Sequence, residues 1–472
     1  MIPELDRIYQ GDCRAIMRGW PAGFIHCCVT SPPYWGLRDY NIEPQVWGGD
    51  PEHEHRWGAE IPGGNRGGSG TPTDKNNRGE GYGRDAGRCN FCECGAWLGS
   101  LGLEPSPKLF IEHIVEIFQE VYRILRNDGT IWVNLGDSYA STWACGRRNA
   151  MGSGACDIGD RLRRTGDGIK EKDLIGIPWM VALALRDDGW YLRQDIIWHK
   201  PNPMPESVED RCTKAHEYLF LLSKSPRYYY DSKAIEEPSS MLTHARGNGV
   251  NPKATSLHGW AHGPGDHSAI GHARKSAGMK TSTKFGHGPG WRVKQNESFS
   301  AAVYEVLPTR NKRSVWTIPT EPYAEAHFAT YPRALVSPCV QAGTSEHGVC
   351  AACGAPWGRI VHKTRSFESG SGRSGRSPEG KRGPQTNNGG ETKDIRRGPV
   401  VHRTTTGWEP ACKCTGGGVS KAIVLDPFMG AGTTALVAAG LNRQFIGCEL
   451  NQDYIAMAER RVASEKTQVK LF

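Results

Sequence analysis

The residues best suited to chemistry are six consecutive ones, Thr30-Ser31-Pro32-Pro33-Tyr34-Trp35. An apolar run at residues 24–29 leads into them and predicts a buried strand. Proline cannot donate to a sheet ladder, so this strand must end where a rigid turn begins. The turn offers a hydroxyl group, carbonyl oxygens and two aromatic rings. These groups can accept hydrogens from an amine and stack on a flat heterocycle, although proline-rich ligand segments have a similar composition.

A second candidate site lies near the end of the chain, at residues 426–434 (DPFMGAGTT). It follows a predicted strand at 421–425 and opens a predicted helix at 433–440. Glycines at such a turn let a ligand approach the backbone closely, and the helix N-terminus favours negative charge. A Walker loop would need a lysine after Gly432, so the loop suits a less anionic ligand, such as the amino-acid part of a nucleoside. Glu449 ends the next predicted strand about 20 residues on, where an acidic side chain can bind ribose hydroxyls.

The cysteines form two groups that could bind metal. The chain has 15 cysteines and no secretory signal, which favours free thiols or metal ligands over disulfides. The later group has ribbon-like spacing and predicts a structural zinc site held by Cys350, Cys353, Cys412 and Cys414. The earlier group predicts a similar knuckle from Cys89, Cys92 and Cys94 with His55 or His53. Unliganded thiols in loops are the alternative for both groups.

Composition places the chain among globular proteins that do not enter membranes. Its 472 residues can bury a real core, while 59 glycines and 30 prolines indicate much loop. The net charge of +8 is compatible with a polyanionic partner but has no concentrated basic tail. No signal core is present, and no apolar run reaches the roughly 18 residues of a membrane span. We therefore expect a cytoplasmic protein.

Hydrophobic periodicity predicts an alternation of helices and strands. The clearest helix is 107–125, ended by Asn127-Asp128-Gly129. Further helices are predicted at 178–186, 324–336 and 453–465. The remaining strands are predicted at 7–10, 130–135, 191–199, 218–222 and 445–448. This alternation predicts an α/β fold, doubly wound around a mostly parallel sheet.

The sequence resembles the DNA amino-methyltransferases of the permuted β group, in which the catalytic motif precedes the cofactor motif. The resemblance is carried by residues 29–34 (VTSPPY) and 426–434 (DPFMGAGTT). Other similar segments lie at 198–205, 216–218, 228–231 and 326–332, the last similar to a helix that closes over the cofactor's methionine end. The resemblance implies an S-adenosylmethionine-dependent methyltransferase fold of Rossmann-like type, here with zinc-ribbon-like insertions.

The resemblance also implies a role for each matched residue. The target base would be held by Ser31, Pro32, Pro33 and Tyr34. The methionine and ribose of S-adenosylmethionine would be lined by Asp426, Phe428, Gly430 and Gly432, with Thr433 and Phe328 also at the cofactor. Glu449 would bind the ribose hydroxyls and Asp12 the adenine amino group. For one site to form, the strands that end at Asp426 and Ser31 must be neighbours in the sheet.

The same resemblance divides the chain into three parts. Residues 1–230 would form the catalytic half with an insertion at 41–101. Residues 231–310 would be the target-recognition region, for which a disordered polar loop is the alternative. Residues 311–472 would form the cofactor-binding half with an insertion at 339–415.

The function implied is site-specific methylation of an exocyclic amine in double-stranded DNA, with a restriction nuclease as a possible partner. Ser31 at the first motif position favours cytosine-N4 as the target, and adenine-N6 is the alternative. Two further hypotheses are a methyltransferase acting on RNA or a protein amide, and a non-enzymatic zinc-ribbon protein that binds nucleic acid.

Overall fold

The computed structural model describes residues 2–36, 42–49, 54–55, 57, 94–140, 168–239, 308–321, 331–366, 400–416 and 418–469. The chain forms two compact units. The first consists of Met1–Ile235, Arg313–Gly358 and Glu409–Phe472, and the second of Glu236–Lys312 and Arg359–Trp408. Within the described ranges, no helix has the length and apolar character needed to cross a membrane.

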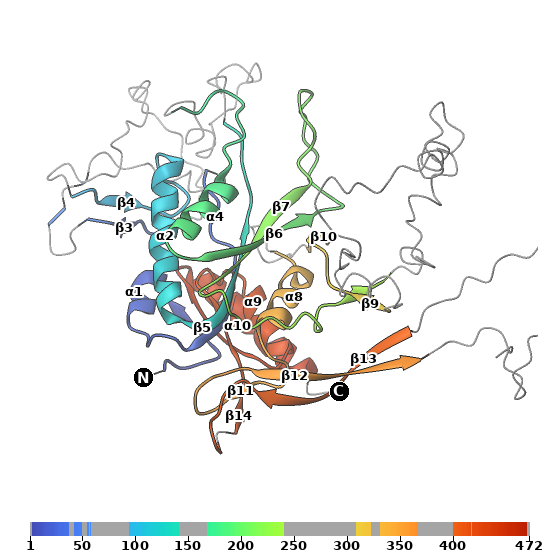
Figure 1. The fold of residues 1–472 in the computed structure, drawn as a ribbon. Helices are drawn as coiled ribbons and strands as arrows, with labels where there is room; N and C mark the ends of the chain where they lie inside the picture. Colours follow the sequence, from blue (N-terminus) through green and yellow to red (C-terminus); the bar gives the residue numbers. More distant parts are fainter. Residues whose placement is uncertain are drawn as a thin grey trace, which may run out of the picture. The chain divides into compact units, whose positions relative to one another are not determined.

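An eight-stranded sheet forms the centre of the first unit (Figure 1). Its strands lie in the order β1 (Arg7–Gln10), β16 (Gln444–Glu449), β15 (Ile423–Asp426), β2 (Ile25–Thr30), β5 (Leu125–Leu135), β7 (His216–Ser223), β6 (Tyr191–His199) and β10 (Val315–Thr317). Every neighbouring pair is parallel except the two that include β7. The predicted mostly parallel sheet is therefore confirmed.

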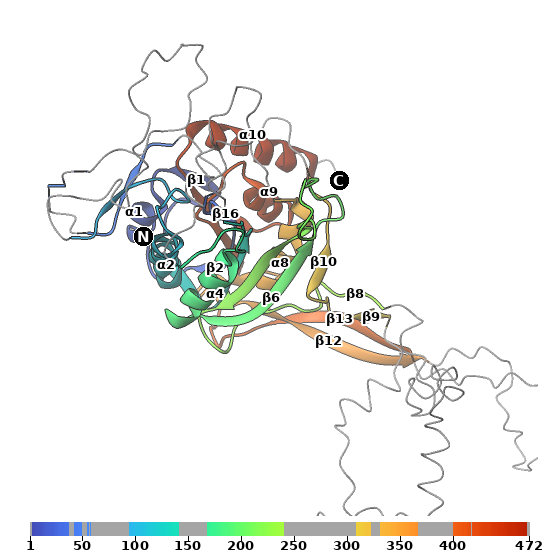
Figure 2. The same cartoon turned by 90° about the horizontal axis from the view of Figure 1, so that it is seen from above.

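Helices cover both faces of this sheet (Figure 2). One face packs against α1 (Cys13–Arg18), α2 (Pro107–Ile124) and α4 (Ile177–Asp187), and the other against α8 (Arg333–Gly343), α9 (Thr433–Gly440) and α10 (Gln452–Val469). Alternation along the strands divides the core between the faces. In β15, Ile423 and Leu425 join the first core and Val424 joins the second.

The helix predicted at 107–125 is α2, and its start follows from local chemistry. Ser106 caps it by accepting a hydrogen bond from the Leu109 backbone N–H at 3.3 Å, and Pro107 occupies the first turn. The prediction that Asn127-Asp128-Gly129 ends the helix is wrong. Leu125 is already extended and begins β5, and the three residues lie inside that strand.

Asn127-Asp128-Gly129 instead belongs to an irregularity in the pairing of β5 with β2. Ile25 pairs with Leu125 but Cys27 pairs with Thr130, so the register shifts between these pairs. Residues of β5 that favour turns elsewhere are therefore accommodated in the strand by a shift in register, as in a β-bulge.

Shorter strand pairs complete the described structure. The first unit contains the pairs β3 (Gln45–Trp47) with β4 (Trp97–Gly99) and β11 (Val349–Cys350) with β14 (Val419–Ser420). The second unit contains β8 (Glu237–Pro238) with β9 (Thr309–Arg310), joined by an Arg310–Glu237 ion pair of 2.8 Å. The pair β12 (Trp357–Ser366) and β13 (Val400–Pro410) accounts for most of its remaining described residues.

The prediction of a helix at 324–336 falls partly on residues 322–330, outside the described ranges. From Arg333 onward it is helical, as α8. This helix runs through the buried Cys339, where the second insertion is predicted to begin. The predicted domain boundaries stay a prediction.

Two glycines provide a matched test of the packing between α9 and α10. Gly432 and Gly176 cap α9 and α4 with φ of +78° and +85°. A Cβ at Gly432 would lie 2.5 Å from Ala458 Cβ, whereas one at Gly176 meets nothing within 4 Å. Gly176→Ala should cost about 1–2 kcal/mol for its left-handed backbone. Gly432→Ala should cost about 1–3 kcal/mol more, because the core is overpacked.

Scanning calorimetry of the two variants measures this difference as a larger fall in Tm for Gly432→Ala. Equal falls would show that α10 moves away from α9 without loss of stability.

Candidate active site

The predicted site residues follow one another along the carboxyl edge of the sheet. Strand β15 lies beside β2 in parallel, with Leu425 opposite Cys28, which confirms the predicted neighbourhood of Asp426 and Ser31. On its other side β15 pairs with β16, and β16 pairs with β1. The segments that end these strands therefore meet at one edge, in the order Asp12, Glu449, Asp426 and Ser31. Crevices at such an edge are where open α/β sheets bind ligands.

The glycine loop, residues 427–432 after β15, is fixed by backbone hydrogen bonds. The Met429 N–H donates to the Cys448 carbonyl at 2.9 Å, and the Gly432 N–H donates to the Met429 carbonyl at 2.9 Å. Gly430 and Gly432 adopt φ of +51° and +78°, which side chains rarely allow. Thr433 then begins α9 as a buried residue.

Glu449 ties this loop to the neighbouring strand. Its Oε2 accepts from the Gly430 N–H at 2.8 Å and its Oε1 from the Asn451 N–H at 2.9 Å. Burial raises the pKa of this carboxyl, and the two hydrogen bonds act against that shift. A carboxylate oxygen has two lone pairs. With the Leu450 backbone N–H as a third donor, the Glu449 carboxylate keeps acceptor capacity for one more hydrogen bond, which suits a ribose hydroxyl.

Asp12 occupies the end of β1 as the N-cap of α1. Its carboxylate accepts from the Arg14 backbone N–H at 2.9 Å and from the Arg14 guanidinium at 2.7 Å. Arg14 is 4% exposed and lies 3.6 Å from the centre of the Trp47 ring. The side chain of Asp12 is therefore fixed, and its contact with an adenine amino group stays a prediction.

Asp426 is enclosed by hydrogen-bond donors of the protein, and its contact with the cofactor stays a prediction. It is fully buried, and its carboxylate accepts hydrogen bonds from Thr30, Tyr331, Thr434 and the Phe428 backbone. Burial raises the pKa of Asp426, and these donors oppose the shift.

The predicted catalytic turn, residues 31–34, is connected to a polar network at the start of β7. The Ser31 hydroxyl donates to the Tyr34 hydroxyl at 3.3 Å, and Tyr34 donates to Glu217 Oε2 at 2.8 Å. Asn134 donates to the same Glu217 oxygen at 2.8 Å, and the Lys200 ammonium group pairs with Oε1. The turn is thus anchored by charged and amide groups from three different strands or strand ends.

Glu217 and Asn134 were not among the predicted site residues. Glu217 lies in the segment 216–218, which already resembles a family motif. Asn134 is a buried polar residue near the end of a mostly apolar strand. A polar residue in such a position must find a partner, and this was the signal that could have identified it.

A second group of contacts fixes the far end of the turn. The Trp35 indole N–H donates to the Glu104 carbonyl at 2.9 Å, and the Gly36 N–H donates to the Gly102 carbonyl at 2.8 Å. Glu104 is fully buried, accepts from the Gly102 N–H at 2.8 Å and pairs with His113 at 3.0 Å. Burial raises the pKa of the Glu104 carboxyl, and the contact with His113 acts against it.

The ring of Tyr34 also requires a glycine beside it. A Cβ at Gly136 would lie 2.6 Å from the Tyr34 ring. Pro32 is buried, whereas Ser31, Pro33 and Tyr34 are partly exposed. The Ser31 hydroxyl and an aromatic ring are thus accessible on a turn whose backbone is fixed.

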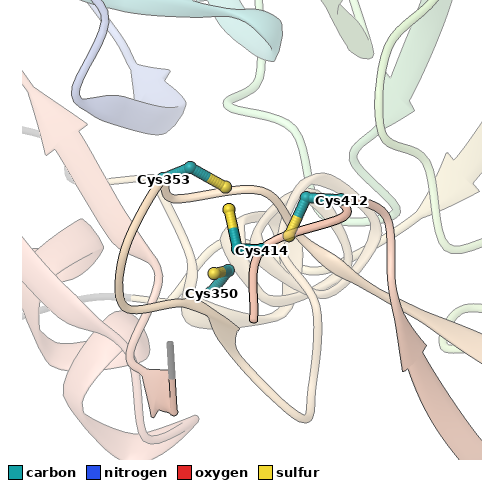
Figure 3. Close-up of side chains that lie close together, drawn as sticks. All are labelled: Cys350, Cys353, Cys412 and Cys414. Atoms are coloured by element: carbon teal, nitrogen blue, oxygen red, sulfur yellow. The ribbon is translucent and has the colours of Figure 1, made fainter. Parts of the chain in front are cut away.

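The four later cysteines meet as their spacing predicts (Figure 3). Their sulfur atoms all lie within 4.8 Å of one another, in a group formed by Cys350, Cys353, Cys412 and Cys414. Such a set fits the tetrahedral thiolate coordination of a structural zinc ion. The cysteine knuckle, defined as residues 350–354, is held to the start of β2 and to β5. His26 contacts the Gly354 carbonyl at 3.0 Å, and Arg126 donates to the Cys353 carbonyl at 2.7 Å.

The earlier metal group and one cofactor residue lie mostly outside the described residues. The residues outside the described ranges are Phe328, His53, Cys89 and Cys92. The described members are Cys94 and His55, with Sγ and Nδ1 3.7 Å apart. Their contact is consistent with a shared site.

Comparison with known proteins agrees with this geometry. Residues 25–351 and 419–460 match the N6/N4 methyltransferase family model, described as DNA methylase. The Type II methyltransferase M.Cfr9I of Citrobacter freundii is 30% identical over 468 residues, covering 98% of this chain and 89% of the relative. M.XycI of Xanthomonas campestris pv. cyanopsidis is 29% identical over 462 residues, covering 98% of this chain and 89% of the relative.

Among solved structures, PvuII DNA methyltransferase (cytosine-N4-specific) is similar, with a TM-score of 0.42 and 12% identity. The match covers 99% of this chain and 93% of that one. The family assignment rests on the family model and the Citrobacter freundii relative. The chain therefore belongs to the N6/N4 DNA methylase family and is an S-adenosylmethionine-dependent DNA methyltransferase.

Proposed function

We propose that the protein methylates the exocyclic N4 amine of cytosine in duplex DNA. The observation that supports amine methylation is the position of the Ser31 hydroxyl, on a fixed turn beside the glycine loop, and serine at this first motif position favours cytosine as the base. Adenine-N6 remains the alternative target, because a Ser-Pro-Pro-Tyr turn can accept hydrogens from either amine. The base must leave the duplex to reach this turn.

The turn would activate a poor nucleophile. The lone pair of an exocyclic amine is delocalised into the ring, so its nitrogen gains density when its hydrogens are bound by acceptors. The Ser31 hydroxyl and the Pro32 carbonyl would be those acceptors. Bound S-adenosylmethionine would supply the methyl group. The nitrogen would form a bond to that carbon as the carbon–sulfur bond breaks and S-adenosylhomocysteine leaves, and the methylated nitrogen would then lose one proton to water. Positioning and preorganised polar groups would supply most of the rate enhancement.

The network beyond the turn sets the direction of the Ser31 hydroxyl. Because Ser31 donates its hydrogen to Tyr34, its lone pairs are free to accept from the amine. Tyr34 in turn donates to Glu217, which is paired with Lys200. Both oxygens of Glu217 already have partners in the protein, so its role would be to orient Tyr34 rather than to remove a proton.

Product analysis tests the function directly. Purified protein is incubated with tritiated S-adenosylmethionine and bacteriophage DNA from a methylation-deficient host, and the released nucleosides are identified by mass spectrometry. We expect N4-methylcytidine in its deoxy form. N6-methyladenine would transfer the assignment to the alternative base, and no labelled DNA would contradict the function.

Ser31→Ala should lower the rate of methyl transfer on the order of 10²-fold, because one preorganised polar contact to the reacting group is lost. The Kd for S-adenosylmethionine, measured by calorimetry, should not change. Tyr34→Phe keeps the ring and removes only the hydroxyl that orients Ser31, so its loss should be smaller. An unchanged rate in Ser31→Ala would remove the hydroxyl from the mechanism.

We also propose that the later cysteine group holds a structural zinc ion. The four thiolates offer a closed coordination set, and the short strands β11 and β14 beside it provide little core of their own. The ion would join the knuckle to the segment that contains Cys412. A corresponding site would use Cys94 and His55 with Cys89 and Cys92.

Metal analysis by mass spectrometry should show one zinc ion fewer per chain in Cys412→Ser than in the unaltered protein. Cys212→Ser is the matched control, because Cys212 is an exposed free cysteine outside the group. Zinc near zero in the unaltered protein, or equal zinc in the two variants, would contradict this site.

The names of the relatives suggest a wider role. Both are called Type II methyltransferases, and we propose that this chain is the modification enzyme of a restriction–modification pair. Its target-recognition region would lie at 231–310, mostly outside the described residues. Sequencing of methylated DNA should then show modification confined to one short sequence; modification without sequence preference would contradict this role.

A further inference from the structure

We propose that Asp426 is a positioning residue that fixes the catalytic turn relative to the cofactor loop, and not a ligand of the cofactor. The inference rests on the proposed function, because it concerns the same methyl-transfer site. It replaces the role that the family resemblance implies for this side chain.

One oxygen of Asp426 joins the two halves of the site. Oδ1 accepts from the Thr30 hydroxyl at 2.6 Å and from the Phe428 backbone N–H at 3.0 Å. Thr30 immediately precedes Ser31, and Phe428 lies in the glycine loop. Thr30 and Asp426 are 396 residues apart in sequence. A single carboxylate oxygen therefore holds both at a defined separation.

The other oxygen adds two hydroxyl partners. Oδ2 accepts from Thr434 at 2.7 Å and from Tyr331 at 2.9 Å. The hydroxyls of Tyr331 and Thr434 are also in contact with each other. Thr434 lies within 3.2 Å of the Val29 carbonyl, so it bridges from α9 back to the strand that leads into the turn.

Tyr331 brings a third segment into the same group. It belongs to the segment 326–332, which resembles the part of the family that closes over the cofactor's methionine end. Burial and the neighbouring carboxyl raise the pKa of the Tyr331 hydroxyl, which keeps it a hydrogen-bond donor at neutral pH. The catalytic turn, the glycine loop and this segment thus share one buried acceptor.

The burial of Asp426 argues against contact with a ligand. Its side chain is fully buried, Oδ1 already accepts two hydrogen bonds, and Oδ2 lies within hydrogen-bond distance of two hydroxyl groups. A carboxylate oxygen has two lone pairs, so Oδ1 has none left for the cofactor, and the hydroxyls of Tyr331 and Thr434 cover Oδ2. By contrast, Glu449 keeps acceptor capacity at the same edge.

Substitution of the partners tests the positioning role without removing the buried charge. Thr30→Val keeps the shape of the side chain and removes its hydroxyl. At saturating S-adenosylmethionine it should lower the methyl-transfer rate on the order of 10²-fold, because displacement by about 1 Å has that effect. The Kd for the cofactor should stay unchanged, and Thr30→Ser should restore the rate.

A double-mutant cycle tests whether Thr30 and Tyr331 act through the same carboxylate. Tyr331→Phe removes only a hydroxyl group. If Asp426 couples the two, the combined variant should lose less rate than the product of the single losses. Tm values are measured in parallel, so that a general loss of folding is recognised as a fall in Tm. Rescue of the rate by Thr30→Ser then shows that the hydroxyl group itself is needed.

Three outcomes would overturn the inference. The first is an unaltered rate in Thr30→Val. The second is a higher Kd for the cofactor in that variant with an unaltered rate at saturation. The third is that the two substitutions lower the rate independently in the double-mutant cycle. The unaltered protein is the control for function. If it transfers no methyl group to DNA, the proposed function fails; if it does and Thr30→Val matches it, only the positioning role fails.

Discussion

The parallel pairing of β15 with β2 is the constraint on which the rest of the site depends. It places the end of a strand near the carboxyl terminus of the chain beside the end of one near its amino terminus. The hydrogen bond from Thr30 to Asp426 then closes the gap between the two ends. Once these strands are adjacent, the glycine loop and the proline turn must open onto the same edge. The two motifs therefore meet at one site although they lie near opposite ends of the sequence.

Much of the fold could be predicted from the sequence because its signals are local. Apolar runs, helical spacing and the two prolines identified most strands and helices of the first unit, and the glycine loop identified the turn into α9. The error at Asn127-Asp128-Gly129 shows the limit of such signals. These residues favour turns, but the fully buried Leu125 and the pairing with β2 make them part of β5. Tertiary packing overrides local preference there.

The site itself was predicted only in part, for a similar reason. Ser31 and Tyr34 are recognisable from their neighbours in sequence, whereas Glu217 and Asn134 matter because of partners far along the chain. Asp426 lies at the predicted edge of the sheet, yet nothing in its motif indicates that Thr30 and Tyr331 contact its oxygens. A sequence motif predicts which residues lie at the carboxyl edge of the sheet. Which of them face the ligand depends on burial and on the donors that three-dimensional structure brings together.

In the first unit, polar contacts hold the strands of the sheet at their amino ends as well as at the carboxyl edge. Its carboxyl edge carries the site, while His26 and Arg126 bind the cysteine knuckle at the start of β2 and on β5. His26 also accepts from the Ile423 N–H at 3.0 Å, so it joins the starts of β2 and β15. Burial lowers the pKa of this imidazole to about 4, which keeps it neutral and able to accept that bond. The two strands that present the site are therefore fastened at both ends.

A crystal structure with S-adenosylhomocysteine and a duplex target would test the central claim most directly. The account predicts that the cofactor lies along the carboxyl edge, with its ribose hydroxyls on Glu449 and its sulfur facing the turn at Ser31. Asp426 should keep its four protein partners and make no contact with the cofactor. A cofactor bound away from the glycine loop, or bound by the Asp426 carboxylate, would contradict the account.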